Sequence, residues 1–207
     1  MAGSQPIDYV NWTSDNGGGI VYGTLNGGIN VTYSGEVTFD QLNGIGTYYY
    51  TDPSQVYGSG IEYTANPVIA NTPLTSDIIA ITGTPGFTDT FTFSRPVVDP
   101  VMLLVSMGQS SVLTTYTFDT PFVVLSDGPG WWGGPGTLVQ SVNSLTGIEG
   151  DGAIQFLGSY SSISFTGSAP ENWNGFTIGV PVPDASSSAW LLSGVMMGLG
   201  LLKRKLS

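Results

Sequence analysis

Carboxylates are the side chains in this sequence best suited to chemistry, and its four glutamates are Glu36, Glu62, Glu149 and Glu171. A glycoside hydrolase needs two carboxyl groups roughly 5–10 Å apart, one of them with a raised pKa. Glu149 and Asp151 stand two residues apart in "IEGDGAI", a spacing that puts two side chains on one face of a strand. The segment therefore predicts a pair of acids on a strand, with hydrolysis of a glycosidic bond as the chemistry to test.

The same segment resembles the Glu-x-Asp-x-x-Glu signature of jelly-roll glucanases, in which the last acid completes the catalytic pair. Ile154 occupies that last position here, so the acid-base partner is missing. Two acids in a turn before a strand explain the segment without catalysis. We therefore expect that the protein is not an enzyme, and keep a carboxylate-based glycoside hydrolase as the second alternative.

Tryptophans in glycine-rich segments indicate a different function, carbohydrate binding. Sugar rings present apolar C–H faces that stack on aromatic rings. Trp131 and Trp132 stand in "DGPGWWGGPG", where glycine and proline offer little bulk to bury two indoles, and Asp127 precedes them as a hydrogen-bond acceptor. Trp173 and the tyrosines at 48–50 are further candidates. A carbohydrate-binding module is thus the first alternative, with Trp131, Trp132, Asp127 and Trp173 as its ligand-binding residues.

The sequence contains neither His nor Cys, and this removes several kinds of site. A Ser-His-Asp relay, a cysteine nucleophile, a zinc-thiolate centre and a disulfide are all excluded. Hard cations, which prefer oxygen ligands, remain open. We expect no cofactor other than Ca²⁺, for which Asp127, Glu149 and Asp151 are the candidate ligands.

Hydrophobic residues recur at every second position through most of the chain, which indicates half-buried strands. In "FTDTFTF", Phe87, Asp89, Phe91 and Phe93 share one predicted face. Thirty Gly and thirteen Pro interrupt such runs at short intervals, as in "LNGG", "TGTPG" and "SDGPGWWGGPG", which read as turns or longer connections. "DIIAIT" and "PVMLLVSMG" are continuously apolar and predict central strands covered on both faces. The fold class is therefore all-β, an antiparallel two-sheet sandwich of jelly-roll type, over residues 7–180.

Positive charge is concentrated at the C-terminal end. The net charge is -11, and Arg95 is the only Lys or Arg before the cluster Lys203, Arg204 and Lys205. An acidic surface repels phosphate backbones, so we expect no nucleic-acid partner.

The cluster follows the apolar run "AWLLSGVMMGLGLL". A helix over residues 185–202 would be about 27 Å long, close to the roughly 30 Å of a bilayer core. We expect a transmembrane helix whose basic end stays in the cytoplasm, with the acidic body outside it.

Three features in a fixed order, "VPDASS", an apolar span and a basic end, resemble the C-terminal sorting signals of the PEP-CTERM class, in its VPDSG-type variant. The resemblance implies a bacterial protein that an exosortase recognises at Val182, Pro183 and Asp184 and cleaves nearby. Residues 147–180 are also similar to the β-rich bodies of such proteins. Residues 181–207 are thus interpreted as a sorting signal, with the exosortase and the membrane as partners. A C-terminal anchor that is never processed is the alternative.

The first residues, "MAGSQPIDYV", have neither the basic nor the apolar region of a secretory signal. We interpret residues 1–6 as an N-terminal segment near a mature start, with "MAGS" readable as a cloning remnant. The expected protein is exported, anchored at first through its C-terminus, and then found at the cell surface or in the extracellular matrix. There its role is structural or adhesive, with extracellular polysaccharide as a further partner.

Overall fold

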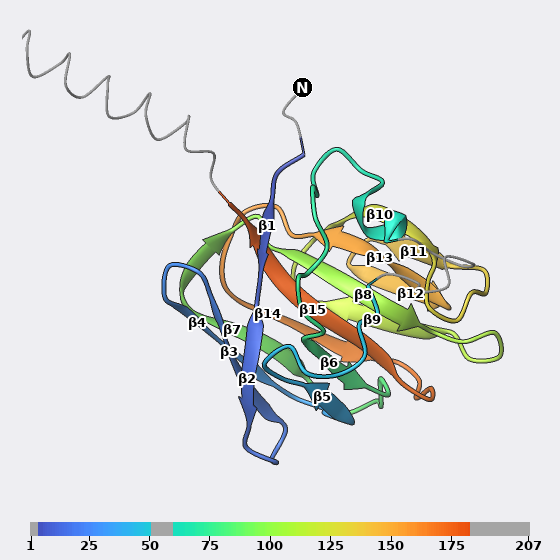
Figure 1. Cartoon of the computed structure of the whole chain (residues 1–207). Helices are drawn as coiled ribbons and strands as arrows, with labels where there is room; N and C mark the ends of the chain where they lie inside the picture. The colour runs from blue at the N-terminus through green and yellow to red at the C-terminus, as the bar shows by residue number, and fades with distance from the viewer. Residues whose placement is uncertain (1–3, 51–59, 183–207) are drawn as a thin grey trace, which may run out of the picture.

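The computed structural model describes residues 4–50 and 60–182, and most of them lie in β-strands (Figure 1). The described residues contain one short helix, α1 (Ile61–Thr64). The strands are β1 (Ile7–Tyr9), β2 (Asn11–Asp15), β3 (Ile20–Leu25), β4 (Ile29–Ser34), β5 (Phe39–Gln41), β6 (Ile78–Ile81), β7 (Asp89–Val98), β8 (Val101–Met107), β9 (Thr114–Phe118), β10 (Val123–Pro129), β11 (Thr137–Ser141), β12 (Ser144–Ile148), β13 (Gly150–Gln155), β14 (Ser159–Gly167) and β15 (Asn174–Pro181).

The strands form two sheets packed face to face, and every pairing between the described strands is antiparallel. The first sheet has the order β10-β13-β8-β15-β6-β5, with β1 alongside β15. The second has the order β11-β12-β9-β14-β7-β4-β3-β2. The prediction of an all-β antiparallel sandwich is therefore confirmed.

Alternation of side chains explains the strands of the second sheet. Along β7, Asp89, Phe91 and Phe93 are buried while the threonines between them are less buried or exposed. The predicted face was wrong at one position: Phe87 is 46% exposed, because it precedes the strand and lies in the connection from β6.

Two hydrophobic cores explain the continuously apolar strands of the first sheet. Met102 and Leu104 of β8 face the inner core between the sheets, whereas Leu103 and Val105 face an outer core on the opposite surface. The outer core is covered from outside by Tyr50, by Tyr63 of α1 and by Ile69, among other residues. The prediction that β6 and β8 are buried on both faces is thus confirmed.

The glycine-rich connections differ in length from one another. The turn at residues 26–28 joins β3 to β4, and both Gly27 and Gly28 have the positive φ that favours glycine (73° and 75°). "SDGPGWWGGPG" was predicted to be a connection throughout, and this is wrong for its first part. β10 continues to Pro129, because residues 126–129 pair with β13, so the loop spans only residues 130–136.

The sorting signal falls almost entirely outside the described residues. Val182 ends the described chain, is partly exposed, and donates its backbone N–H to the carbonyl of Pro6 at 2.9 Å. Pro183, Asp184, the apolar span and the basic end lie beyond it. Within residues 4–50 and 60–182, no helix has the length and apolar character needed to cross a bilayer.

Candidate functional site

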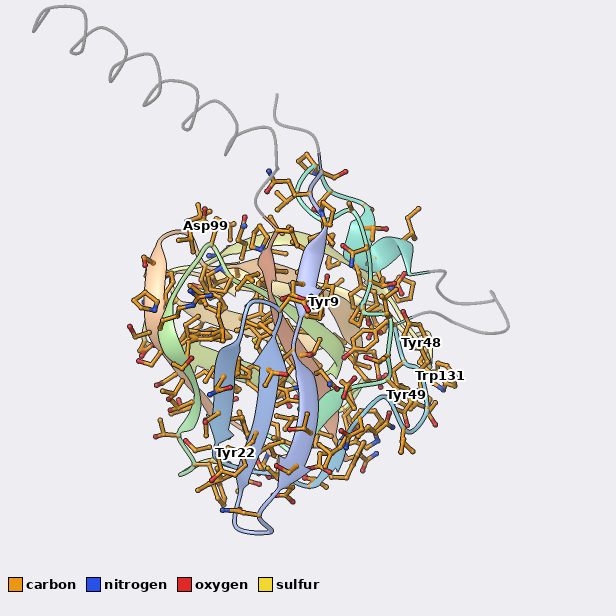
Figure 2. The ribbon with its side chains drawn as sticks, turned by 60° about the vertical axis from the view of Figure 1, so that its left-hand side comes forward. Tyr9, Tyr22, Tyr48, Tyr49, Asp99 and Trp131 are labelled. Atoms are coloured by element: carbon orange, nitrogen blue, oxygen red, sulfur yellow. The ribbon has the colours of Figure 1, made fainter. Side chains whose placement is uncertain are left out.

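Three of the five tryptophans meet two other aromatic rings at one side of the sandwich. This aromatic cluster consists of Phe39, Tyr49, Trp131, Trp132 and Trp173. The Tyr49 ring is central, with ring centroids 5.3 Å from Trp131, 5.5 Å from Trp132 and 5.3 Å from Trp173. Figure 2 shows Tyr49 and Trp131 close together at the same side of the molecule. The three predicted sugar-stacking tryptophans therefore share one surface.

The tyrosines at 48–50 alternate between the core and this surface. Tyr50 is fully buried and donates its hydroxyl to the carbonyl of Asp77 at 2.7 Å. Tyr48 donates to the carbonyl of Pro73 at 2.6 Å. Tyr49, between them, packs against the tryptophans. Of the three, only Tyr49 belongs to the aromatic cluster.

Glycines hold the tryptophan loop close to two carboxylates. A Cβ atom at Gly130 would lie only 1.4 Å from Oδ2 of Asp151. A Cβ atom at Gly134, which also has a φ of +87°, would lie 2.7 Å from Cβ of Glu149. Both positions need the absence of a side chain. The loop that carries Trp131 and Trp132 therefore lies directly on Asp151 and Glu149.

A β-bulge at Ser106 turns this serine toward the two acids. The pairing of β13 with β8 is irregular here, so that Val105 and Ser106 together lie opposite Asp151. Ser106 has a φ of 55°; its N–H donates to Oδ1 of Asp151 at 2.9 Å, and its hydroxyl donates to Oε2 of Glu149 at 3.1 Å. Glu149 also has a positive φ (49°). Two strained residues in contact are a feature that clusters at functional sites.

Asp151 is almost fully buried and connects three elements. Besides the bond from Ser106, its Oδ1 accepts the hydroxyl of Tyr63 in α1 at 2.9 Å. Burial raises the pKa of Asp151 to about 8; the hydrogen bonds from Tyr63 and Ser106 counteract part of this rise, while the charges of Glu62 and Glu149 add to it. Its carboxyl group is therefore largely protonated at neutral pH.

Glu171 approaches the same region from the segment before β15. Its Oε1 accepts the N–H of Gly108 and the side-chain amide of Asn174, both at 2.7 Å. Burial raises the pKa of Glu171 to about 7; the bonds from Gly108 and Asn174 counteract part of this rise, and the charge of Glu149 adds to it. Glu171 thus changes its charge close to neutral pH.

These groups surround a pocket of about 220 Å³ next to the aromatic cluster. We name it the acidic pocket, and it is lined by Ser106, Gln109, Trp132, Glu149, Glu171, Asn172 and Trp173. Trp132 is 47% exposed, so one indole is open to solvent at its edge. The pocket can therefore offer ring faces, carboxylates and amide groups to one small polar ligand.

The other predicted site residues lie elsewhere. Asp127 is exposed on β10, accepts the N–H of Leu138 at 3.1 Å and does not line the acidic pocket. Within the part of the chain that the structure describes, no group of three or more acidic side chains is arranged to hold a metal ion. Ca²⁺ binding at Asp127, Glu149 or Asp151 stays a prediction.

The remaining glutamates have partners of their own. Glu36 accepts the N–H groups of Gly83 and Thr84 at 3.0 and 2.9 Å. Burial raises the pKa of Glu36, but hydrogen bonds from Thr82 and Thr84 outweigh it and hold the pKa below its usual value. Glu62 is buried in α1, near Asp151.

A larger hollow of about 710 Å³ runs beside β1, but it gathers no comparable chemistry. Its one carboxylate, Asp8, accepts hydrogen bonds from the backbone and the side chain of Asn26. Tyr9, which also lines it, donates its hydroxyl to the carbonyl of Asn71 at 3.0 Å. The acidic pocket is therefore the better candidate, despite its smaller size.

Sequence reasoning missed the polar part of the site. Ser106 gave no signal, because a bulge inside an apolar strand leaves no trace in the alternation. Gln109 and Asn172 lie in connections between strands, where no such pattern applies. Glu171 was only one of four glutamates, although it stands two residues before Trp173. Comparisons with protein-family models, curated proteins and solved structures found no match to this chain, so the site is judged on its own geometry.

The raised pKa of Asp151 predicts a protein that is more stable in mild acid. Between the ordinary value of 3.8 and the folded value of about 8, the folded chain binds more protons than the unfolded chain. The free energy of unfolding should therefore fall as pH rises through this window. Asp151→Asn keeps the acceptor for Tyr63 and Ser106 but removes the charge. At pH 9 it should unfold with a free energy on the order of 2–5 kcal/mol above that of the wild type.

Urea unfolding at pH 5 and pH 9 measures this effect. Asp127→Asn, which removes an exposed carboxylate from the neighbouring strand β10, is the matched control and should follow the wild type. An Asp151→Asn variant that loses as much stability with rising pH as the wild type contradicts the prediction.

Proposed function

We propose that this chain is an exported bacterial β-sandwich that adheres to polysaccharide at the cell surface or in the extracellular matrix, using the aromatic cluster and the acidic pocket. One observation carries the proposal: Trp131, Trp132 and Trp173, from two distant parts of the sequence, pack around Tyr49 beside a polar pocket. Sugars need this combination, because their rings stack on aromatic faces while their hydroxyl groups bond to polar side chains.

The orientation of the rings supports stacking. The Trp132 and Trp173 rings are nearly perpendicular (83°) with centroids 5.0 Å apart. Edge-to-face contacts of this kind hold aromatic side chains firmly. Because Trp132 is half exposed, its ring contributes surface to a ligand without first leaving the core.

We also propose that the sandwich is of the jelly-roll type. The order β6-β15-β8-β13 in one sheet and β7-β14-β9-β12 in the other supports this. From β6 onward, successive strands alternate between the sheets, apart from the hairpin of β11 and β12. Such alternation is typical of two interlocked Greek keys.

Adhesion to polysaccharide predicts that Trp132 is essential and that a distant aromatic is not. Trp132→Ala removes an exposed ring face and should weaken binding at least about tenfold, because truncating an anchoring tryptophan costs about 2 kcal/mol. Affinity electrophoresis through gels that contain a neutral glucan, chitosan or a polyuronate measures the binding.

Tyr22→Ala is the matched control, since Tyr22 is 43% exposed and lies on β3 of the second sheet, well apart from Tyr49 and Trp131 (Figure 2). It should leave retardation in the gel unchanged. Absence of retardation by every polysaccharide, or equal retardation of the Trp132→Ala variant, would favour a purely structural role.

Export rests on the resemblance of residues 181–207 to an exosortase signal. In cells that carry an exosortase, cleavage should occur near Val182, Pro183 and Asp184. The intact mass of the protein should then be lower by the mass of the residues that follow the cleavage point. Pro183→Ala should retain the full mass and accumulate in the membrane fraction. Full-length wild-type protein in such cells, or a soluble Pro183→Ala variant, contradicts the sorting proposal.

Hydrolysis of a glycosidic bond is a second candidate, and one observation favours it. Glu149 and Glu171 line the same pocket, and burial raises the pKa of Glu171 to about 7, which suits a general acid. Glu171 donates a proton to the leaving oxygen, and Glu149 accepts one from the attacking water. Glu171→Gln should then lower the release of reducing ends by about 100-fold or more. No release from any polysaccharide that binds would leave adhesion as the function.

A further inference from the structure

Two carboxyl groups line the acidic pocket, and no Lys or Arg among residues 4–50 and 60–182 lines it with them. Glu149 and Glu171 line the pocket, and the charge of Glu149 raises the pKa of both Glu171 and Asp151. Arg95 is the only Lys, Arg or His before residue 203. Its guanidinium donates to the carbonyl of Gly27 at 3.1 Å and lines a different hollow. Within the described residues the carboxylates of the pocket thus lack a cationic neighbour in its lining, and a positively charged ligand would neutralise them.

The aromatic walls of the pocket also favour a cation. Trp132 and Trp173 line it at right angles to one another, so their faces point in different directions. The face of an indole attracts an ammonium group, and more strongly than the ring of Tyr or Phe. Indole rings and carboxylates therefore line one pocket, and both attract a positive group.

The remaining lining of the pocket suits a sugar ring. Gln109 and Asn172 each carry an amide that can donate and accept, and the hydroxyl of Ser106 adds a further polar atom. The volume of about 220 Å³ is below the 300–1,000 Å³ of sites for drug-sized ligands. One sugar residue of a longer polymer fits this description better than a folded protein surface does.

A hard metal ion fits the pocket less well than an organic ammonium group. Ca²⁺ takes 6–8 oxygen ligands, whereas Trp132 and Trp173, which are part of this lining, supply none. In addition, Oε1 of Glu171 already accepts two hydrogen bonds, from Gly108 and Asn174. An ammonium group needs only a few acceptors and gains from the ring faces.

We propose that the acidic pocket selects an amino sugar with a free ammonium group, so that the polysaccharide bound by this domain is one that contains de-N-acetylated hexosamine. The inference rests on the proposed carbohydrate binding and specifies its ligand class. The ammonium group lies between the carboxylates of Glu149 and Glu171, and the sugar ring stacks on Trp132. Uronic acids and sulfated sugars are repelled by the same carboxylates.

Three oligosaccharides with one β-1,4-linked backbone test the proposal, because they differ only at C2. The hexamer of glucosamine carries an ammonium group there, that of N-acetylglucosamine an acetamide, and cellohexaose a hydroxyl. Titration calorimetry at pH 7 and low salt, where about half of Glu171 is ionised, should give at least about tenfold tighter binding of the glucosamine hexamer than of cellohexaose, the size of a cation–π contact in a desolvated site.

Variants separate the pocket from the general acidity of the protein. Glu149→Gln and Glu171→Gln should each bring the ratio of the affinities for the glucosamine hexamer and for cellohexaose close to one. Asp127→Asn removes the same charge at an exposed carboxylate outside the pocket and should keep the preference. Trp132→Ala should weaken the binding of all three hexamers.

Four outcomes are decisive. Equal affinity for the three hexamers overturns the selection of an amino sugar and leaves carbohydrate binding in place. If Asp127→Asn lowers the preference for glucosamine as much as Glu149→Gln does, the pocket is not the cause of that preference. Binding of Nα-acetyl-lysine as tight as that of glucosamine overturns the requirement for a sugar ring. No binding of these hexamers or of any polysaccharide overturns the proposed function itself.

Discussion

The candidate site depends on the hydrogen bonds and packing contacts of one buried group, the carboxyl group of Asp151. It accepts hydrogen bonds from the N–H that the bulge at Ser106 turns toward it and from the hydroxyl of Tyr63. Gly130 packs directly on its second oxygen. Strands β8 and β13, helix α1 and the tryptophan loop are therefore joined at one buried group. Because this group is held largely protonated by burial, the junction depends on a proton instead of a salt bridge.

A chain with a single cation in its first 202 residues has few ways to bury acids. Glu36 is stabilised as a carboxylate by hydrogen bonds from Thr82 and Thr84, and its pKa falls. Asp151 and Glu171 are more deeply buried and accept fewer hydrogen bonds than Glu36 does, and their pKa values rise. The difference follows the depth of burial, which is least at Glu36, together with the number of hydrogen-bond donors around each group. Within the described residues, no Lys or Arg lines the acidic pocket beside Glu149 and Glu171.

The alternation of side chains was sufficient to predict the sandwich, and Phe91 and Phe93 lie where a period of two predicts. Trp131, Trp132 and Trp173 do meet at one surface, while their role in binding a sugar stays a prediction. The pocket itself was not predictable. It arises from a register irregularity at Ser106 and from a positive φ at Glu149, neither of which changes the pattern of apolar residues. The meeting of the tryptophans through Tyr49 is likewise a tertiary effect, because residue 49 is more than 80 positions from Trp131 in the sequence.

The aromatic cluster continues the outer core to the surface, and this gives the site its stiffness. Tyr50 packs against Tyr63 inside the outer core with ring centroids 5.8 Å apart, while its neighbour Tyr49 contacts the tryptophans. Phe39 and Trp173 pack against the same core, and their rings meet edge to face at 5.0 Å. Rings held in this way lose little freedom when a ligand binds, so more of the contact energy remains as affinity. The outer core therefore does more than cover the apolar outer face of the first sheet. It also holds the aromatic rings that the proposed ligand would contact.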